Sequence, residues 1–341
     1  SRGTIISIVL VLAVLPQILV VGDIIIEKSG GSDKQPVGRV IYFDGPENTY
    51  LFNNFTGLLR VRDKNEWFPR YVFYSLFANY KKGGTRPFEN KTTGLHNLKT
   101  DDYVSRYEIT EIPLHKQIAI CAQLDQILKV INLRRKELSN LDDLIKARFV
   151  EMFGDPVLLT KKWNMKSVES VCKDIYGGGT PSKAHPEYYE YGDIPWVSSK
   201  DMKTDVITDS QIKINQLGVD NSTAKLVPVG SVIMVIRSGI LKHTLPVAIN
   251  AVPITVNQDL KVFIAGKDIL PRFLAIQFKM LERDILSGVR AVTADNIEFN
   301  SLKQREIIVP PIELQKQFVE FLEQIDKSKY HFSSSSLFSV F

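Results

Sequence analysis

A glycine-rich loop that also carries hydroxyl and lysine side chains runs from Gly177 to Lys183 and reads GGGTPSK. Proteins often hold phosphate with glycines placed beside hydroxyls and a lysine. A nucleotide-binding Walker loop, however, has Gly directly before its Lys, and Ser182 stands in that place here. Pro181 also removes a backbone N–H that a phosphate cradle would use. Two interpretations stay open: a tight structural turn, and a nucleic-acid contact through Thr180, Ser182 and Lys183.

Other cations and hydroxyls lie where the chain is expected to turn. The pairs Lys28-Ser29 and Arg237-Ser238 each follow an apolar segment and occupy equivalent places in two similar stretches. An arginine there could pair with a guanine edge, and a solvated turn is the alternative. The segment 81–91 is dense in Lys and Arg, which favours contacts with the phosphate backbone of a nucleic acid. The candidate DNA contacts are Lys28, Ser29, Lys81, Lys82, Thr85, Arg86, Lys91, Thr180, Ser182, Lys183, Ser199, Lys200, Arg237, Ser238 and Lys242.

Catalytic and metal-binding motifs are missing from the sequence. It contains no H-E-x-x-H, no G-x-S-x-G, and no Asn/Asp-Pro-Pro-aromatic motif of the kind used for adenine methylation. Its five histidines are scattered, and its cysteines, Cys121 and Cys172, are too few for a disulfide framework. We therefore expect no catalytic residues, metal or cofactor in this chain.

Composition indicates a folded chain of ordinary polarity. Its 341 residues suggest two domains, 44% of them are hydrophobic, and the net charge of +5 permits an acidic partner such as DNA without requiring one. Residues 5–21 form a nearly continuous apolar run. A membrane span needs about 20 such residues, so we expect buried strands here, with a membrane-directed segment as the alternative.

The chain repeats itself once, with a period near 200 residues. Gln117 and Leu124 recur 198 positions later as Gln315 and Leu322. We therefore expect a domain followed by a helix, and then the same arrangement again. The matching segments are 21–31 with 229–240, 68–80 with 270–280, and 112–127 with 310–325.

A long helix is predicted from Leu114 to Met152, where apolar residues recur every seven positions. Its 39 residues would span about 58 Å, which suits an element that separates two others. Gly154 and Pro156 are expected to end it. The heptads favour a left-handed coiled coil, and a helix inside a helical bundle is the alternative. The expected seam consists of Ile120, Leu124, Ile127, Ile131, Leu138, Leu141 and Ile145.

Short β-branched runs and short helices flank the long helix on both sides, which predicts mixed strand-and-helix domains of the α+β class. Several motifs, in this order, resemble the specificity (S) subunit of type I restriction–modification systems. Residues 176–202 resemble the opening of a target-recognition domain, and residues 112–156 resemble the central spacer helix. Residues 21–31 and 90–98 resemble the rear half of a first recognition domain. Residues 309–329 resemble the start of a second spacer helix.

The resemblance, which covers residues 19–329, implies four parts. These are a partial first recognition domain (1–111), a spacer helix (112–156), a second recognition domain (157–309), and the start of a second spacer helix with a divergent tail (310–341). The opening of the first domain and a long second helix are missing from the sequence, so we expect a truncated chain. Self-association of such chains is left open.

The same resemblance implies a non-catalytic, cytoplasmic subunit that reads double-stranded DNA at a bipartite target. Its partners would be modification (methyltransferase) subunits and restriction subunits. S-adenosylmethionine, ATP and Mg would belong to those partners. The alternative is a coiled-coil scaffold or a membrane-tethered interaction protein, motivated by the heptads and by residues 5–21.

Overall fold

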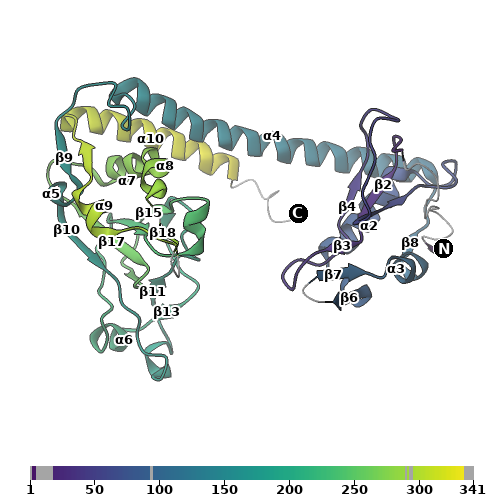
Figure 1. Ribbon diagram of the computed structural model, residues 1–341, viewed down its shortest axis with the longest axis horizontal. Helices are drawn as coiled ribbons and strands as arrows, with labels where there is room; N and C mark the ends of the chain where they lie inside the picture. The colour runs from purple at the N-terminus through teal and green to yellow at the C-terminus, as the bar shows by residue number, and fades with distance from the viewer. Residues whose placement is uncertain (1, 5–17, 93–94, 289, 292–294, 334–341) are drawn as a thin grey trace. The chain divides into compact units, whose positions relative to one another are not determined.

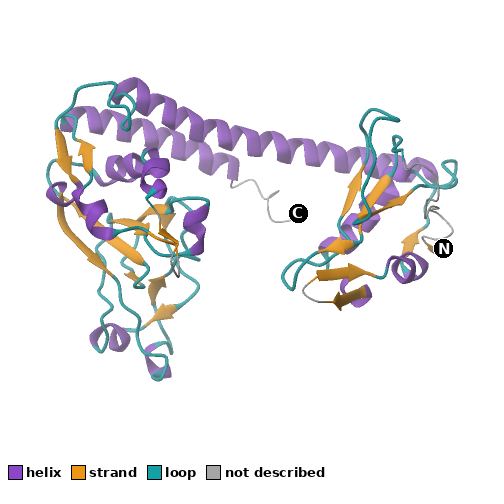
Figure 2. Cartoon of the chain, viewed as in Figure 1, coloured by secondary structure: helices purple, strands orange, loops and turns teal. Residues whose placement is uncertain are grey.

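The computed structural model divides the chain into two units, residues 1–133 and 134–341, and each is described by itself. Both units mix strands and helices, which confirms the predicted α+β class (Figure 1, Figure 2). Within the described residues, no helix is both long and apolar enough to cross a membrane. Most of the apolar run at 5–21 lies outside the described part. The structure describes residues 2–4, 18–92, 95–288, 290–291 and 295–333.

Unit 1 is built on a three-stranded antiparallel sheet in the order β4-β2-β5. The β-branched run of β2 alternates in burial, and Ile24 and Ile26 are fully buried. Helix α2 packs Val72 and Leu76 into the same core. The bounds are β2 Ile24–Glu27, β4 Val40–Tyr42, β5 Thr56–Leu59 and α2 Pro69–Lys81. The other elements are β1 Arg2–Thr4, β3 Ser29–Gly30, η1 Arg86–Phe88, β6 Glu89–Thr92, β7 Leu95–Leu98, α3 Thr100–Arg106 and β8 Glu108–Thr110.

Unit 2 has a five-stranded sheet in the order β10-β17-β14-β15-β12 and a three-stranded sheet in the order β13-β11-β16. Helix α7 lies between the larger sheet and α10 (Figure 1). The sheets comprise β10 Cys172–Gly177, β11 Ile194–Val197, β12 Val206–Ile207, β13 Lys213–Ile214, β14 Val232–Val235, β15 Val247–Asn250, β16 Thr255–Val256 and β17 Leu260–Ala265. Around them lie β9 Met165–Ser167, α5 Val168–Val171, η2 Pro186–Tyr188, α6 Gln216–Asp220, η3 Gly239–Lys242, α7 Pro271–Met280, α8 Glu282–Ser287, β18 Arg290–Ala291, β19 Asp295–Asn296, α9 Phe299–Gln304, β20 Glu306–Ile308 and α10 Ile312–Ser333.

The predicted repeat is confirmed by the sheets. In unit 1 the central strand β2 pairs antiparallel with β4 on one side and β5 on the other. In unit 2 the corresponding strand β14 pairs in the same way with β15 and β17. Each central strand follows a glycine with positive φ, Gly22 at 97° and Gly230 at 82°. Each unit then continues into a helix that begins with proline, at Pro69 and Pro271.

A buried glutamine on a later helix, α4 (Leu114–Phe153) in unit 1 and α10 in unit 2, contacts the start of each of these helices. Gln117 and Gln315 are both fully buried. Gln117 Oε1 accepts from the N–H of Phe68 at 2.8 Å, and its Nε2 donates to two backbone carbonyls. Gln315 Oε1 accepts from the N–H of Leu270 at 2.9 Å, and its Nε2 also donates to two carbonyls. The two glutamines therefore share a structural role and satisfy every polar atom they bury.

A matching arginine strengthens the same joint in each unit. Arg70, the second residue of α2, pairs with Asp125 at 2.8 Å. Arg272, the second residue of α7, pairs with Asp326 on α10. Each pair therefore links the first turn of the shorter helix to the longer helix of the same unit.

The long helix α4 runs from Leu114 to Phe153, 40 residues, as the heptads predicted. It ends at Gly154, whose φ of 81° favours glycine. Within unit 2, Phe149 and Phe153 pack against Phe318 of α10. Farther along α10, Lys329 pairs with Asp142, which lies earlier on α4. The two helices are therefore antiparallel there, side by side in Figure 1.

The expected seam of α4 is filled unevenly. Ile145 and Leu141 join the core of unit 2, and Ile131 is also buried. Leu124, Ile127 and Leu138 are partly buried. Ile120 is 40% exposed instead, so it is not enclosed by the described residues of unit 1, and its role at a coiled-coil or subunit interface stays a prediction. The heptad pattern predicts where a helix can pair but does not supply the partner helix.

Candidate nucleic-acid interface

In unit 2, two parallel strands bring distant polar segments to one edge. β11 and β16 pair in parallel, with Trp196 opposite Thr255 and Val197 opposite Val256. The carboxyl ends of parallel strands lie side by side, so the turn after β11 meets the segment after β16. The N–H of Asn257 donates to the carbonyl of Val197 at 2.9 Å across this junction. We call this region the polar edge, and it comprises residues 177–183, 198–201, 237–238 and 257–261.

The turn that follows β11 is held by one carboxylate. Asp201 accepts hydrogen bonds from the N–H of Ser198 at 2.9 Å and from its hydroxyl at 2.7 Å. A third bond, from the N–H of Gln211, uses its other oxygen. With the turn fixed, Ser199 is half-buried and Lys200 is exposed to solvent. Both residues predicted here as DNA contacts therefore lie on the polar edge.

The glycines of the 177–183 loop serve close backbone packing. The N–H of Gly179 donates to the carbonyl of Val256 at 3.0 Å, and Trp196 Nε1 donates to the carbonyl of Gly179 at 2.9 Å. A Cβ on Gly178 would lie 1.8 Å from the oxygen of Val256. Only glycine allows this approach, so the interpretation as a tight structural turn holds for Gly178 and Gly179.

The side chains of the same loop point to different roles. The hydroxyl of Thr180 bonds the side chain of Gln258, which ties the loop to the segment after β16. Ser182 accepts from the N–H of Ala184 at 3.3 Å and remains exposed. Lys183 is also exposed. All three side chains are exposed, and the hydroxyl of Thr180 is in addition hydrogen-bonded to another segment of the protein.

Arg237 follows strand β14 and is clamped by a carboxylate. Its Nε lies 2.7 Å and its Nη2 lies 2.6 Å from Oδ1 of Asp259, and its side chain is 47% exposed. Asn257 orients the clamp, because its Nδ2 donates to Asp259 at 3.1 Å and its Oδ1 accepts from the Asp259 N–H. The result is an accessible cation fixed beside an acceptor, a combination that the sequence did not indicate.

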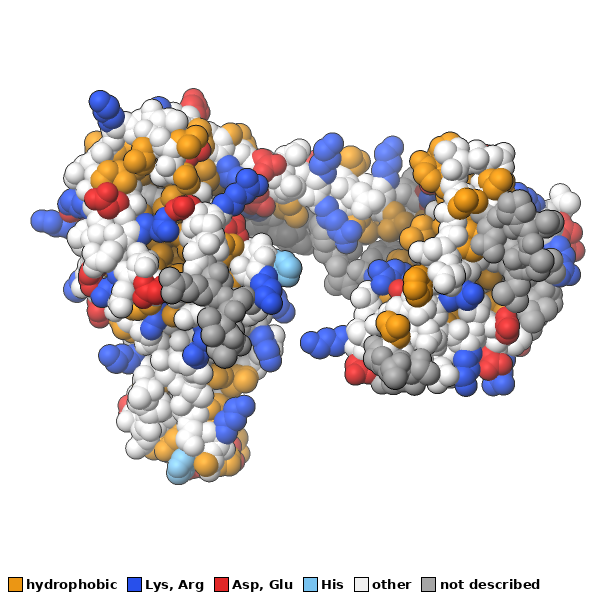
Figure 3. Space-filling view, viewed as in Figure 1, with side chains coloured by type: hydrophobic (Ala, Val, Ile, Leu, Met, Phe, Trp, Pro, Cys, Tyr) orange, Lys and Arg blue, Asp and Glu red, His pale blue; other side chains and the backbone are white. Residues whose placement is uncertain are grey.

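Ser238 precedes the short helix η3 and caps it, since its hydroxyl accepts from the N–H of Ile240. Lys242 ends that helix and is exposed. The structure therefore joins Ser199, Lys200, Arg237 and the 177–183 loop at the polar edge. Lys and Arg side chains are spread over the visible face with Asp and Glu between them, so charge alone does not mark the interface (Figure 3).

In unit 1 the candidates are divided. Lys81, Lys82 and Arg86 are exposed at and after the end of α2. Thr85 is fully buried, so its prediction as a DNA contact was wrong. Its methyl group lies 2.8 Å from where a Cβ of Gly38 would be, which shows that Thr85 packs against the backbone there. The side chain of Lys91 lies outside the described part.

The predicted equivalence of the two strand-end pairs is wrong by one residue. Lys28 and Ser29 donate their N–H groups to one carbonyl, that of Phe55, at 2.7 and 3.1 Å. In unit 2 it is Ile236 and Arg237 that share one carbonyl in the same way. Ser29 is therefore the counterpart of Arg237, and Lys28 lies one position earlier. Strands β2 and β14 correspond residue by residue without a gap, which places Ser29, and not Lys28, opposite Arg237 in the repeat.

Sequence reasoning missed Lys261, on β17 beside Arg237. A single lysine in an apolar strand usually points to solvent, so no signal marked it.

Burial raises the pKa of the Cys121 thiol to about 11 and that of the Cys172 thiol to about 12. Both thiols stay protonated and unreactive at neutral pH. Among the described residues no group of His, Cys, Asp and Glu side chains is arranged to hold a metal ion.

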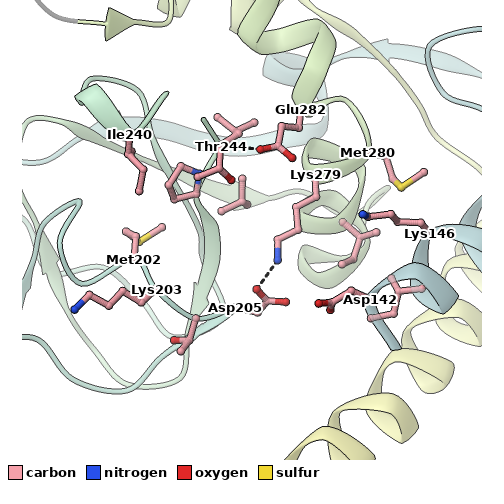
Figure 4. A pocket seen from close by; sticks show the side chains of 16 residues that line it. Asp142, Lys146, Met202, Lys203, Asp205, Ile240, Thr244, Lys279, Met280 and Glu282 are labelled. Carbon is pink, nitrogen blue, oxygen red and sulfur yellow. Dashed lines mark hydrogen bonds and ion pairs between the residues drawn. The ribbon is translucent and has the colours of Figure 1, made fainter. Parts of the chain in front are cut away.

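A cavity of about 540 Å³ in unit 2 lies between α4, α7 and the loops before β12 and β15 (Figure 4). Lys279 reaches across it to Asp205 at 2.5 Å, and Glu282 accepts from the N–H of Leu245 at 2.7 Å. These charged groups hold the walls together. They form no nucleophile–base arrangement around a shared reacting position.

Comparison with known proteins gives a consistent result. Residues 160–333 match the family model described as the type I restriction modification DNA specificity domain. The chain is 31% identical over 274 residues to the specificity subunit of the type I restriction enzyme EcoR124I/EcoR124II of Escherichia coli, covering 77% of this chain and 65% of that protein. It is 28% identical over 193 residues to the MjaIX specificity subunit of Methanocaldococcus jannaschii, covering 54% and 43%. The chain thus spans less than two thirds of the length of either relative.

Two solved structures share the fold. The crystal structure of a type I restriction–modification S subunit from M. genitalium aligns with a TM-score of 0.58 at 14% identity, covering 100% of this chain and 93% of that one. A chain from a structural study of assembly and conformational transition in a type I restriction–modification system aligns with a TM-score of 0.53 at 16% identity, covering 92% and 76%.

Proposed function

Because the chain belongs to the family of type I restriction–modification DNA specificity domains, we propose that it reads double-stranded DNA through the polar edge of unit 2. The observation that carries this proposal is the convergence of four separate segments on that edge. Three of them bring an exposed or half-exposed cation or hydroxyl, and the fourth, 257–261, brings the acceptor Asp259; backbone and side-chain hydrogen bonds hold the segments in place. The chain itself contributes recognition, and chemistry belongs to its partners.

The side chains of the edge suit two kinds of DNA contact. Lys183 and Lys200 are exposed point charges on fixed loops, which suits phosphate oxygens. Arg237 and Asp259 present a donor fork beside an acceptor. Arginine pairs with guanine O6 and N7, and a carboxylate accepts from cytosine N4, so this pair suits base edges in the major groove. Contacts of the second kind provide sequence specificity.

The proposal includes the organisation of the whole chain. We assign residues 157–309 to one recognition domain and residues 1–111 to part of another, with residues 112–156 as the spacer and 310–341 as the start of a second spacer. The exposed cations Lys81, Lys82 and Arg86 suit the phosphates of a second half-site. The 40 residues of α4 would set a separation of about 60 Å between its ends.

The partners follow from the same proposal. Modification (methyltransferase) subunits bind the specificity subunit, and restriction subunits join them to cleave. S-adenosylmethionine, ATP and Mg are held by those subunits, and the complex acts in the cytoplasm. Two copies of this chain could rebuild a two-domain reader, with the exposed stretch of α4 near Ile120 as the pairing surface.

Selection from a random-sequence duplex pool tests the proposal. The chain is incubated with and without its methyltransferase subunit, and bound duplexes are sequenced. We expect enrichment of a split sequence in the presence of the methyltransferase. Genome methylation mapped with and without this gene should show the same sequence. If no duplex is retained above a scrambled-protein control in either arm, DNA recognition is refuted. Recovery of the chain in a membrane fraction would then favour the scaffold alternative.

A further inference from the structure

Lys261 occupies an unusual position in the sheet of unit 2. It lies on β17 between Gly177 of β10 and Met234 of β14, so strands flank it on both sides. Its ammonium group lies 4.5 Å from the centre of the Phe299 ring. The side chain is half-buried. A lysine in such a place loses part of its hydration, which is unfavourable unless another group compensates for it.

The nearby charges do not compensate for it. Within the described part of the chain, no carboxylate pairs with Lys261, because the nearby Asp259 is held by Arg237. Burial lowers the pKa of the Lys261 amine, and repulsion by Arg237 lowers that pKa further. Two cations and one carboxylate therefore lie close together at the polar edge, the carboxylate pairs with Arg237, and the charge of Lys261 is left unbalanced.

Lys303, which lies near the same Phe299 ring, differs from Lys261 because its charge is paired. Lys303 lies 5.9 Å from the centre of the Phe299 ring, on α9, and its amine pairs with Glu169. Its charge is thus balanced inside the protein. Lys261 and Lys303 use the same ring for packing but differ in whether an anion is already present.

Space for the Lys261 amine comes from the glycine loop. A Cβ on Gly177 would lie 2.6 Å from the Lys261 Nζ, so any larger residue would displace the amine. At Gly178 and Gly179 the space that a side chain would fill is instead taken mainly by backbone atoms of neighbouring segments. The loop that opens the recognition domain therefore leaves room for a cation that lies 84 positions later in the chain.

We propose that Lys261 binds one phosphodiester of the DNA backbone, next to the base that Arg237 and Asp259 read. The phosphate supplies the missing negative charge. Phe299 packs against the amine, and Gly177 leaves the space that the amine occupies. This inference rests on the proposed DNA-binding function and adds a residue to it. Because the contact is to phosphate, Lys261 contributes affinity to every sequence alike and no specificity of its own.

The test measures duplex affinity against salt concentration for the full chain with its methyltransferase subunit. Each phosphate contact contributes about 0.9 to the slope of log K against log salt, which at 0.15 M salt is about fivefold in affinity. We expect Lys261→Met and Lys261→Gln to lose that amount on selected and random duplexes equally. Lys303→Met, the matched control, should keep the wild-type slope.

The outcomes separate the two proposals. If the wild-type chain binds no duplex with its methyltransferase subunit, the proposed function fails. If the wild type binds with a salt-dependent affinity and either neutral variant of Lys261 keeps the full slope, this inference is overturned and the lysine only packs on Phe299. All slopes are measured well below the lowest melting temperature among the variants, so that loss of folded protein does not enter the comparison.

Discussion

The buried glutamine of unit 2 offers a prediction whose size follows from its contacts. In Gln315→Ala the N–H of Leu270 and the carbonyls of Asp268 and Pro310 lose their partner. Leaving a buried polar group unsatisfied costs about 1–3 kcal/mol, and removal of one buried methylene costs about 0.8 kcal/mol. We expect unit 2 to lose about 2–4 kcal/mol of unfolding free energy.

The repeat makes the prediction sharper. Gln117→Ala removes the three equivalent hydrogen bonds of unit 1, which include the one to the residue before α2, and should destabilise unit 1 by a similar amount. Each variant should lower the unfolding transition of its own unit. Gln304→Ala is the control, since that exposed side chain makes one surface bond, to Glu169 at 2.9 Å. Its effect should stay within about 0.5 kcal/mol.

Urea unfolding measures the free energies, and native-state hydrogen exchange assigns them to a unit. The amide of Leu270 should lose protection in Gln315→Ala and keep it in Gln117→Ala. If Gln315→Ala costs no more than Gln304→Ala, water or a shifted backbone replaces the lost bonds. The joint between domain and helix would then not depend on this side chain.

Three further predictions concern DNA. Lys183→Ala should weaken all duplexes alike and reduce the slope of log K against log salt by about one unit, measured by titration at several salt concentrations; an unchanged slope would leave the loop a structural turn only. Arg237→Ala should cost about 1–3 kcal/mol on the selected sequence and much less on random duplexes in gel-shift titrations, and equal losses would identify a phosphate contact instead. Insertion of four helical residues near Asn140 should lengthen the spacer by about 6 Å, so methylation mapping should find the same half-sites about two base pairs farther apart; an unchanged gap would exclude α4 as the ruler.

Local patterns predicted the elements well. The heptads and the Gly-Asp-Pro ending placed the long helix to within one residue of its observed end at Phe153. The repeat was visible because Gln117 and Gln315 keep both their identity and their spacing to the helix start. These signals depend on periodicity and on glycine and proline chemistry, which act over a few neighbouring residues.

The features that the sequence hid depend on long-range pairing. Nothing near Arg237 in the sequence indicates that Asp259 will clamp it, because the clamp forms only after β14 pairs with β17. The burial of Thr85 depends on Gly38, which lies 47 positions away. A polar residue in a basic segment is predicted to be exposed, and only the folded structure shows that another segment of backbone packs against it and buries it.

The polar edge also explains how such a domain could change its target without losing its fold. The residues that hold the edge in place use backbone atoms and small side chains, as in the contact of Gly178 and Gly179 with Val256. The side chains that we propose to contact DNA, such as Lys183, Lys200 and Arg237, are exposed and lie outside the core. Surface substitutions of this kind usually change stability by less than about 0.5 kcal/mol. Specificity can therefore vary at the strand ends while the backbone contacts beneath them keep the edge in the same position.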